Sequence, residues 1–165
     1  MASFYGSVAD FRSYHTARGV STAAYDDAAV LIQLLVASEW LDAKYRSRYS
    51  GIKYGDRTQL REWPRSDAND VNGWSISHEI VPEEVKHSTY EVTLKVLQTP
   101  DVLNKDFTPS KYSQVSVTGA VHVQYLSNRD IADVQTRFAS VEQTIAPVLS
   151  RGNGATSAVS GEGYR

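Results

Sequence analysis

The spacing of apolar residues predicts two helices in the first third of the chain. The stretch Ser7–Arg18 has apolar residues at helical spacing, a capping-box-like start and Gly19 as a natural stop. A second helix is expected to begin at Ser21 or Asp26 and to end at Tyr45. Its middle is apolar on nearly all sides, which is typical of a helix buried within a bundle or covered by another subunit.

Two further helices are expected later in the chain. One begins near Pro82, a residue suited to the first helical turn, and ends at Thr99. The other begins at Ser127 or Asn128 and runs to the neighbourhood of Leu149. Its apolar residues recur every three or four positions and form one seam: Ile131, Val134, Phe138, Val141, Ile145 and Val148.

The segments between these helices have different patterns. Residues 46–81 are rich in Gly, Asp, Asn and Ser, and they predict a long irregular segment. We expect Trp63, Pro64 and Trp74 to anchor it. Residues 114–126 alternate between polar and apolar side chains, which indicates a two-stranded hairpin or a single bulged strand.

These patterns together predict a mainly α fold. We expect a small four-helix bundle with a β-hairpin or strand insertion before the last helix, formed by residues 1–149 as one helical domain. Residues 150–165 are rich in Gly, Ser and Ala and cannot bury a core by themselves. They are expected to form an extended C-terminal tail that a partner orders.

Composition and charge exclude several classes of protein. The chain has 165 residues, with 17 Lys and Arg against 19 Asp and Glu, for a net charge of −2. This balance argues against a protein built to coat phosphate backbones, although a local basic patch is compatible with it. The absence of cysteine excludes disulfides and thiol catalysis. No apolar run reaches membrane-spanning length and the N-terminus lacks signal-peptide features, so we expect an intracellular protein without membrane contact.

The sequence carries no recognised catalytic or cofactor-binding motif. Glycine-rich phosphate loops, nucleophile elbows and His-Glu-x-x-His pairs are all missing. The histidines lie on different predicted elements and have no metal-ligand spacing: His15, His78, His87 and His122. We therefore expect no enzymatic activity, no cofactor and no metal site.

One stretch interleaves basic and aromatic residues. Its basic members are Lys44, Arg46, Arg48, Lys53, Arg57, Arg61 and Arg65. Single-stranded nucleic acids bind to surfaces of this composition, because aromatic rings stack on bases and cations follow the phosphates. Two other interpretations stay open, namely a solvated helix end followed by a loop pinned by aromatics, or a contact with an acidic protein. The candidate DNA or partner contacts are Lys44, Arg46, Arg48, Arg61 and Arg65.

Several short motifs in a fixed order carry a family resemblance. They occupy residues 5–14, 17–19, 37–45, 59–65, 70–74, 80–86 and 117–125. The most specific are Trp63-Pro64-Arg65 and Val81-Pro82-Glu83-Glu84-Val85. In the order of its elements the chain resembles the small head–tail connector, or adaptor, proteins of tailed bacteriophages. In particular it resembles a phage family labelled DnaT-like single-stranded-DNA-binding protein.

The resemblance implies a structural role in the virion. Connectors of this kind form a homo-oligomeric ring between the portal protein and the tail or neck proteins, and they extend the channel through which genomic DNA passes. It also implies the twelve-fold symmetry of a portal, and a location at the head–tail interface of a virion assembled in the host bacterial cytoplasm. The expected portal or subunit interface is formed by Ser150, Arg151, Val159, Tyr164 and Arg165.

The label of the same family supports an alternative hypothesis, a single-stranded-DNA-binding accessory protein of replication. On this hypothesis the basic and aromatic stretch is the binding surface. Steeply salt-dependent binding that is lost on neutralisation of Arg46, Arg48 and Arg61 would distinguish this protein from a connector.

Overall fold

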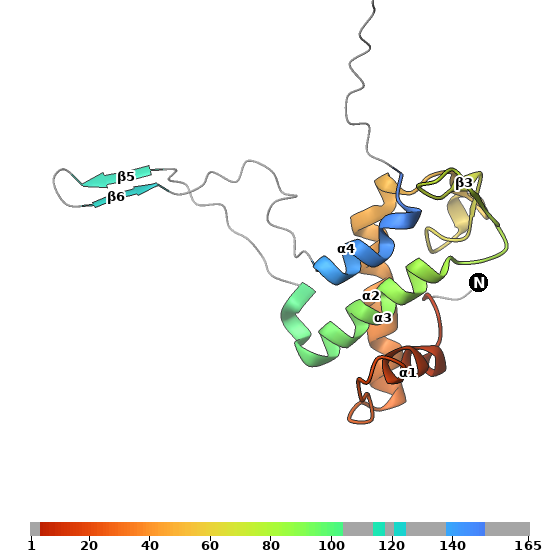
Figure 1. The fold of residues 1–165 in the computed structure, drawn as a ribbon, viewed down its shortest axis with the longest axis horizontal. Coiled ribbons are helices and arrows are strands. Elements are labelled where there is room, and N and C mark those ends of the chain that lie inside the picture. Colours follow the sequence, from red (N-terminus) through yellow and green to blue (C-terminus); the bar gives the residue numbers. More distant parts are fainter. Residues whose placement is uncertain (1–3, 104–113, 118–120, 125–137, 151–165) are drawn as a thin grey trace, which may run out of the picture.

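The structure is a computed structural model, and it describes residues 4–103, 114–117, 121–124 and 138–150. In these residues the chain is mainly helical with small antiparallel strand pairs, which confirms the predicted fold class (Figure 1). The helices are α1 (Val8–Thr16), α2 (Asp27–Tyr45), α3 (Glu83–Gln98) and α4 (Ala139–Ile145).

Local capping signals explain where the first three helices begin. The amide of Asp10 donates to the hydroxyl of Ser7 at 3.1 Å, and that hydroxyl donates to the Asp10 carboxylate at 2.7 Å. Of the two starts predicted for α2, the one at Asp26 is correct, because its carboxylate accepts the amide of Ala29 at 2.6 Å. Helix α3 begins directly after Pro82.

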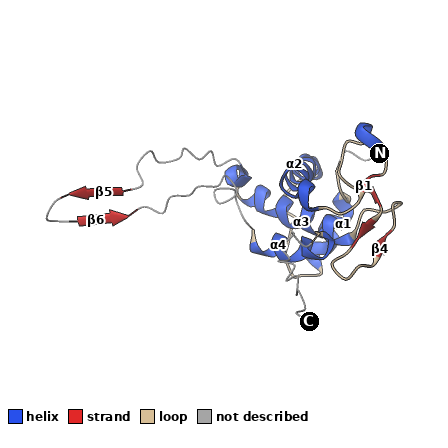
Figure 2. Ribbon diagram, turned by 90° about the horizontal axis from the view of Figure 1, so that it is seen from above, coloured by secondary structure: helices blue, strands red, loops and turns tan. Residues whose placement is uncertain are grey.

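Helix α3 packs against each of the other helices, and α2 lies beside both α1 and α3 (Figures 1 and 2). The core face of α2 follows helical spacing and consists of Val30, Leu34, Ala37, Leu41 and Tyr45. The facing residues of α3 include Val85, Tyr90, Val92 and Val96. Burial of these apolar side chains is the main stabilising contribution to the helical part.

Helix α2 is less enclosed than its apolar composition predicts. Leu31 and Ile32 are 47% and 56% exposed, because α1 and α3 cover the opposite side of the helix. Within the described part of this one chain, α2 is therefore not enclosed on most sides, and cover by another subunit stays a prediction.

The predicted last helix is interrupted at Phe138. Phe138 has an extended backbone, with φ −110° and ψ 107°, so helix α4 begins only at Ala139. It ends at Ile145, and the 3-10 turn that follows contains Pro147. Proline lacks the amide hydrogen that a continuing α-helix requires. Residues 127–137 of the predicted helix lie outside the described residues.

Residues 46–80, called the lobe below, contain more regular structure than expected. Strand β1 (Ile52–Lys53) pairs antiparallel with β2 (Arg65–Ser66), and β3 (Ala68–Asn69) pairs antiparallel with β4 (Ser75–Ile76). Each strand is two residues long, which is too short for an alternating pattern to be recognised in the sequence. The lobe packs on α2 and continues directly from its end.

The alternating stretch before the last helix forms the predicted hairpin. Strand β5 (Gln114–Val117) pairs antiparallel with β6 (Val121–Gln124). Val115 is opposite Val123 in this register. Of the two alternatives left open by the sequence, the two-stranded hairpin is correct and the single bulged strand is wrong.

Candidate nucleic-acid interface

Some of the basic residues predicted as contacts lie at the surface. Arg46 and Arg48 occupy the 3-10 turn that follows α2, and their side chains are 64% and 48% exposed. Lys44, in the last turn of α2, is more enclosed, and its Nζ lies 2.9 Å from a carboxylate oxygen of Glu142 on α4. The exposed turn therefore offers two guanidinium groups to solvent at the end of α2.

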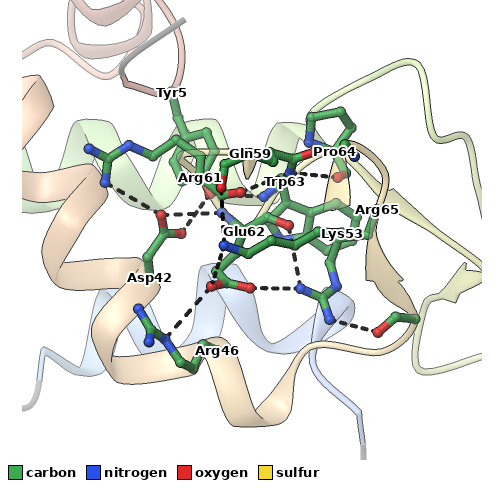
Figure 3. Close-up of polar contacts among 12 residues, drawn as sticks. Tyr5, Asp42, Arg46, Lys53, Gln59, Arg61, Glu62, Trp63, Pro64 and Arg65 are labelled. Atoms are coloured by element: carbon green, nitrogen blue, oxygen red, sulfur yellow. Dashed lines mark hydrogen bonds and ion pairs between the residues drawn. The ribbon is translucent and has the colours of Figure 1, made fainter. Parts of the chain in front are cut away.

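Glu62 is a buried carboxylate that gathers cations of the lobe around it (Figure 3). Its Oε2 lies 2.9 Å from Arg65 Nη1, and its Oε1 lies 3.2 Å from Lys53 Nζ and 3.7 Å from Arg46 Nε. Arg65 also donates to two backbone carbonyl oxygens that precede β1, at 2.7 and 2.6 Å. Because its guanidinium is used internally, Arg65 is not an exposed DNA contact, and that expectation is corrected.

Asp42 is the second buried carboxylate under the lobe (Figure 3). The Tyr5 hydroxyl donates to its Oδ1 at 2.6 Å, and the Glu62 amide donates to its Oδ2 at 3.3 Å. Arg61 Nη1 lies 3.4 Å from Oδ2, while its Nη2 lies 3.0 Å from Glu39. Burial raises the pKa of Asp42, and the hydrogen bonds and the charge of Arg61 oppose that rise. Arg61 therefore compensates the buried Asp42 carboxylate and pairs with the exposed Glu39, so it is not available to a phosphate, contrary to expectation.

The two tryptophans of the lobe have opposite environments. Trp63 is 2% exposed, and its ring meets that of Tyr49 edge-on with 5.5 Å between centroids. Trp74 is 75% exposed, so its expected role as an anchor is corrected. The turn before it is closed instead by Asp70, whose carboxylate accepts the amides of Asn72 and Trp74 at 2.8 and 2.9 Å.

Pro64 lies in the loop that covers Trp63 and follows it through a cis peptide bond. The side-chain amide of the buried Gln59 donates to the carbonyl oxygens of Arg61 and Pro64 at 2.8 and 2.9 Å. Its carbonyl oxygen accepts the amide of Gly55 at 2.8 Å. One side chain therefore satisfies three backbone groups and holds together the two ends of this loop.

The lobe carries an exposed aromatic stack. The rings of Tyr54 and His78 are stacked, with 4.6 Å between centroids and 26° between planes. Tyr54 is 53% exposed and directly follows Lys53, which meets Arg46 at the Glu62 carboxylate. The chain therefore connects the ring pair to the cations at Glu62, and we call these four residues, Arg46, Lys53, Tyr54 and His78, the stacking edge.

The stacking edge could not be predicted as a unit from the sequence. Tyr54 belongs to the basic and aromatic stretch, but His78 lies beyond β4, and no local pattern indicates that their rings meet. The lobe carries two further exposed side chains of the same kinds, Arg57 in the turn after Tyr54 and Trp74. Exposed rings can stack on unpaired bases, and exposed cations can contact phosphates.

The described residues contain no cluster of three or more His, Asp or Glu side chains suited to a metal ion. His87 approaches Glu83 one turn earlier on α3, at 3.6 Å. His15 is buried, with its Nε2 3.1 Å from the carbonyl oxygen of Tyr90. Among the helices in this part of the chain, none has the length and hydrophobicity needed to cross a membrane.

Of the C-terminal residues expected at a portal or subunit interface, only Ser150 is described. Its amide and its hydroxyl both donate to the carbonyl oxygen of Arg48, each at 2.6 Å. The neighbouring residues Tyr49 and Leu149 form an isolated antiparallel bridge. The other residues of this prediction lie outside the described residues: Arg151, Val159, Tyr164 and Arg165.

The fold and the lobe define a small helical protein whose exposed arginines and stacked rings suit a binding function. A family model described as "putative DnaT-like ssDNA binding protein" matches residues 2–161, and the chain belongs to this family. Neither the curated proteins nor the solved structures include one that matches the chain.

This family membership overturns the connector hypothesis. The family description names single-stranded DNA as the ligand, which fits the alternative hypothesis drawn from the sequence. The expected head–tail connector role, the portal and tail proteins as partners, and ring assembly in a virion are therefore wrong. The element order that suggested them does not decide between the two roles, because a fold does not fix a function.

Proposed function

We propose that the protein binds single-stranded DNA through the stacking edge of the lobe, without a chemical step. The observation that carries this proposal is the exposed stack of Tyr54 and His78, which follows directly in the chain from Lys53, the residue that shares the Glu62 carboxylate with Arg46. An unpaired base can extend such a stack, whereas bases within a duplex are already stacked on one another. The description of the family supports the same ligand.

The exposed cations supply the second part of the binding energy. Arg46, Arg48 and Arg57 would contact phosphates on either side of a stacked base. The whole chain has a net charge of −2, so its net charge does not attract DNA. The attraction must come from this local group of cations. Affinity should therefore fall steeply as salt increases.

We propose that the helices act as a four-helix bundle that holds the edge in a fixed geometry. The contacts of α3 with α1, α2 and α4 support this role. The Asp42–Arg61 and Glu62–Arg65 pairs tie the lobe to α2 and to itself. A surface that is ordered before binding loses less conformational entropy when DNA arrives.

Fluorescence anisotropy of a labelled oligothymidine tests the proposal. The wild-type protein should bind at low salt, and the logarithm of the association constant should fall by about 0.7 per logarithmic unit of salt for each phosphate contacted. Tyr54→Leu should weaken binding roughly tenfold, because the loss of one base stack costs about 1–3 kcal/mol. A labelled duplex of the same length should bind more weakly than the single strand.

Two substitutions with the same charge change provide the control. Arg46→Gln removes a cation of the stacking edge, whereas Arg18→Gln removes one that lies 3.4 Å above the ring of Tyr14. Arg18 follows α1, which lies at the other end of α2 from the lobe (Figure 1). Only Arg46→Gln should reduce the salt dependence. Equal effects of both substitutions, or binding unaffected by Tyr54→Leu, would show that the edge is not the binding surface.

A further inference from the structure

Glu142 brings a carboxylate from α4 to the basic end of α2. Its Oε1 lies 2.9 Å from Lys44 Nζ, and its Oε2 lies 4.0 Å from Arg48 Nη1. Arg48 belongs to the same exposed turn as Arg46 of the stacking edge. A single carboxylate therefore neutralises two cations that extend the proposed DNA surface along α2.

Aromatic ring faces hold these two cations in position. Lys44 Nζ lies 4.6 Å from the ring centroid of Trp40 and 5.4 Å from that of Tyr45. The guanidinium carbon of Arg48 lies 5.9 Å from the centroid of Tyr45. Contacts of this kind orient cations independently of an ion-pair partner. Lys44 and Arg48 thus form a prepared anion site, which the Glu142 carboxylate fills.

Glu142 is ionised at neutral pH and able to leave this site. Partial burial alone would raise its pKa. The hydrogen bond and charge of Lys44, with smaller contributions from a hydrogen bond to Tyr45 and the charge of Arg48, outweigh burial, and the pKa of Glu142 is lowered. Its side chain is 32% exposed, compared with 9% for Glu62. Glu142 can therefore turn into solvent when another anion takes its cations, whereas Glu62 is enclosed by the lobe.

We propose that Lys44 and Arg48 form a phosphate subsite, and that Glu142 occupies this subsite in the free protein and thereby sets the affinity for DNA. This inference rests on the proposed binding of single-stranded DNA. A phosphodiester spreads one negative charge over two free oxygens, as a carboxylate does, so it can accept from the same donors. Each bound strand must displace Glu142, which makes binding weaker than two unoccupied cations would allow.

The substitution Glu142→Gln tests this inference, because it removes the charge and keeps the size and polarity of the side chain. The variant should bind labelled oligothymidine about two- to fivefold more tightly than the wild type at low salt, the range expected for release of one surface ion pair. The gain should shrink as salt increases, because salt screens the charge of Glu142 and of the two cations.

Glu83→Gln is the matched control. Glu83 is also paired, with Lys86 and His87, but it lines the groove between α1 and α3. This variant changes the net charge equally and should leave affinity nearly unchanged. In a background that carries both Lys44→Gln and Arg48→Gln, the gain from Glu142→Gln should vanish.

The possible outcomes separate this inference from the proposed function. If Glu142→Gln binds no more tightly than Glu83→Gln, or if the gain survives without Lys44 and Arg48, the inference is wrong while Tyr54-dependent binding still stands. If the wild type binds no single-stranded DNA, both are wrong. Carbon-detected NMR of the unsubstituted protein gives a second test, since the carboxyl signal of Glu142 should move on addition of oligothymidine. A signal that stays in place would overturn the inference.

Discussion

The inner and outer sides of the lobe use the same residue types for opposite purposes. On the inner side, Trp63 is buried and Arg65 is enclosed with Glu62. On the outer side, Trp74 and Arg57 are exposed to solvent. Within one stretch rich in basic and aromatic residues, some side chains are therefore buried and others are exposed. The partners of each side chain decide which.

The difference has an energetic cause. A charge can be buried only when it is paired and hydrogen-bonded, and removal of one partner costs far more than a surface ion pair contributes. Substitutions on the inner side should therefore change the free energy of unfolding. Substitutions on the outer side should change DNA binding and leave stability nearly untouched.

Trp63→Ala should have the largest effect. It removes a ring that packs against Tyr49 in the core, and it should lower the free energy of unfolding by about 3–5 kcal/mol. Trp74→Ala should change this free energy by no more than about 0.5 kcal/mol, because its ring lies in solvent. Urea unfolding followed by circular dichroism measures both. Similar losses in the two variants would refute the division between the two sides.

Arg65→Gln should have the next largest effect, a loss of about 2–3 kcal/mol in the free energy of unfolding. The cost stays below that of a fully unpaired buried charge, because Lys53 and Arg46 remain beside Glu62. Arg57→Gln removes the same charge from the surface and should cost less than about 0.5 kcal/mol.

The order of these two variants should reverse in an oligothymidine binding assay, where Arg57→Gln weakens binding more than folded Arg65→Gln does. An Arg65→Gln variant as stable as the wild type would show that the buried pair adds nothing to the fold.

The smallest effect concerns pH and the buried His15. Burial lowers the pKa of His15 from its ordinary value of 6.5, and the carbonyl of Tyr90 opposes this shift only in part. Because the pKa is lower in the folded state, the contribution of His15 to stability is complete above the unfolded pKa. It is lost as the pH falls through the folded pKa. We expect the urea concentration at the unfolding midpoint to decrease when the pH is lowered from about 7.5 to about 5.5.

A His15→Asn variant isolates this contribution. Burial raises the pKa of Asp42, so protonation of that carboxyl adds stability as the pH falls, the opposite sign to His15. The difference between wild type and variant cancels the effect of Asp42. If the midpoint falls equally in both proteins, the imidazole is not the group responsible.

The helices could be predicted from the sequence because their signals are local. Ser7, Asp26 and Pro82 each lie within one turn of the helix that they begin. The strands of the lobe could not be predicted, because two-residue strands depend on partners far along the chain, such as Ile52 with Ser66. Tertiary contact, and not local preference, decides such segments.

The candidate site shows the same limit. The exposure of Arg46 and Arg48 could be predicted, because the charged end of a long arginine side chain normally stays in water. The position of Arg61 could not be predicted, because its guanidinium meets Asp42 through the fold and not through neighbouring residues. His78 joins Tyr54 for the same reason. The order of motifs led to the correct family, but the role attached to that resemblance was wrong.

The bridge between Tyr49 and Leu149 also has a consequence for how the protein is made. Ser150 bonds to the carbonyl of Arg48, 102 positions earlier in the chain. During synthesis, the turn that carries Arg46 and Arg48 therefore leaves the ribosome long before Ser150, which bonds to it. Contacts so distant in sequence raise the contact order and slow folding relative to a bundle closed only by neighbouring helices. The contact with Arg48 forms only after Ser150 has left the ribosome.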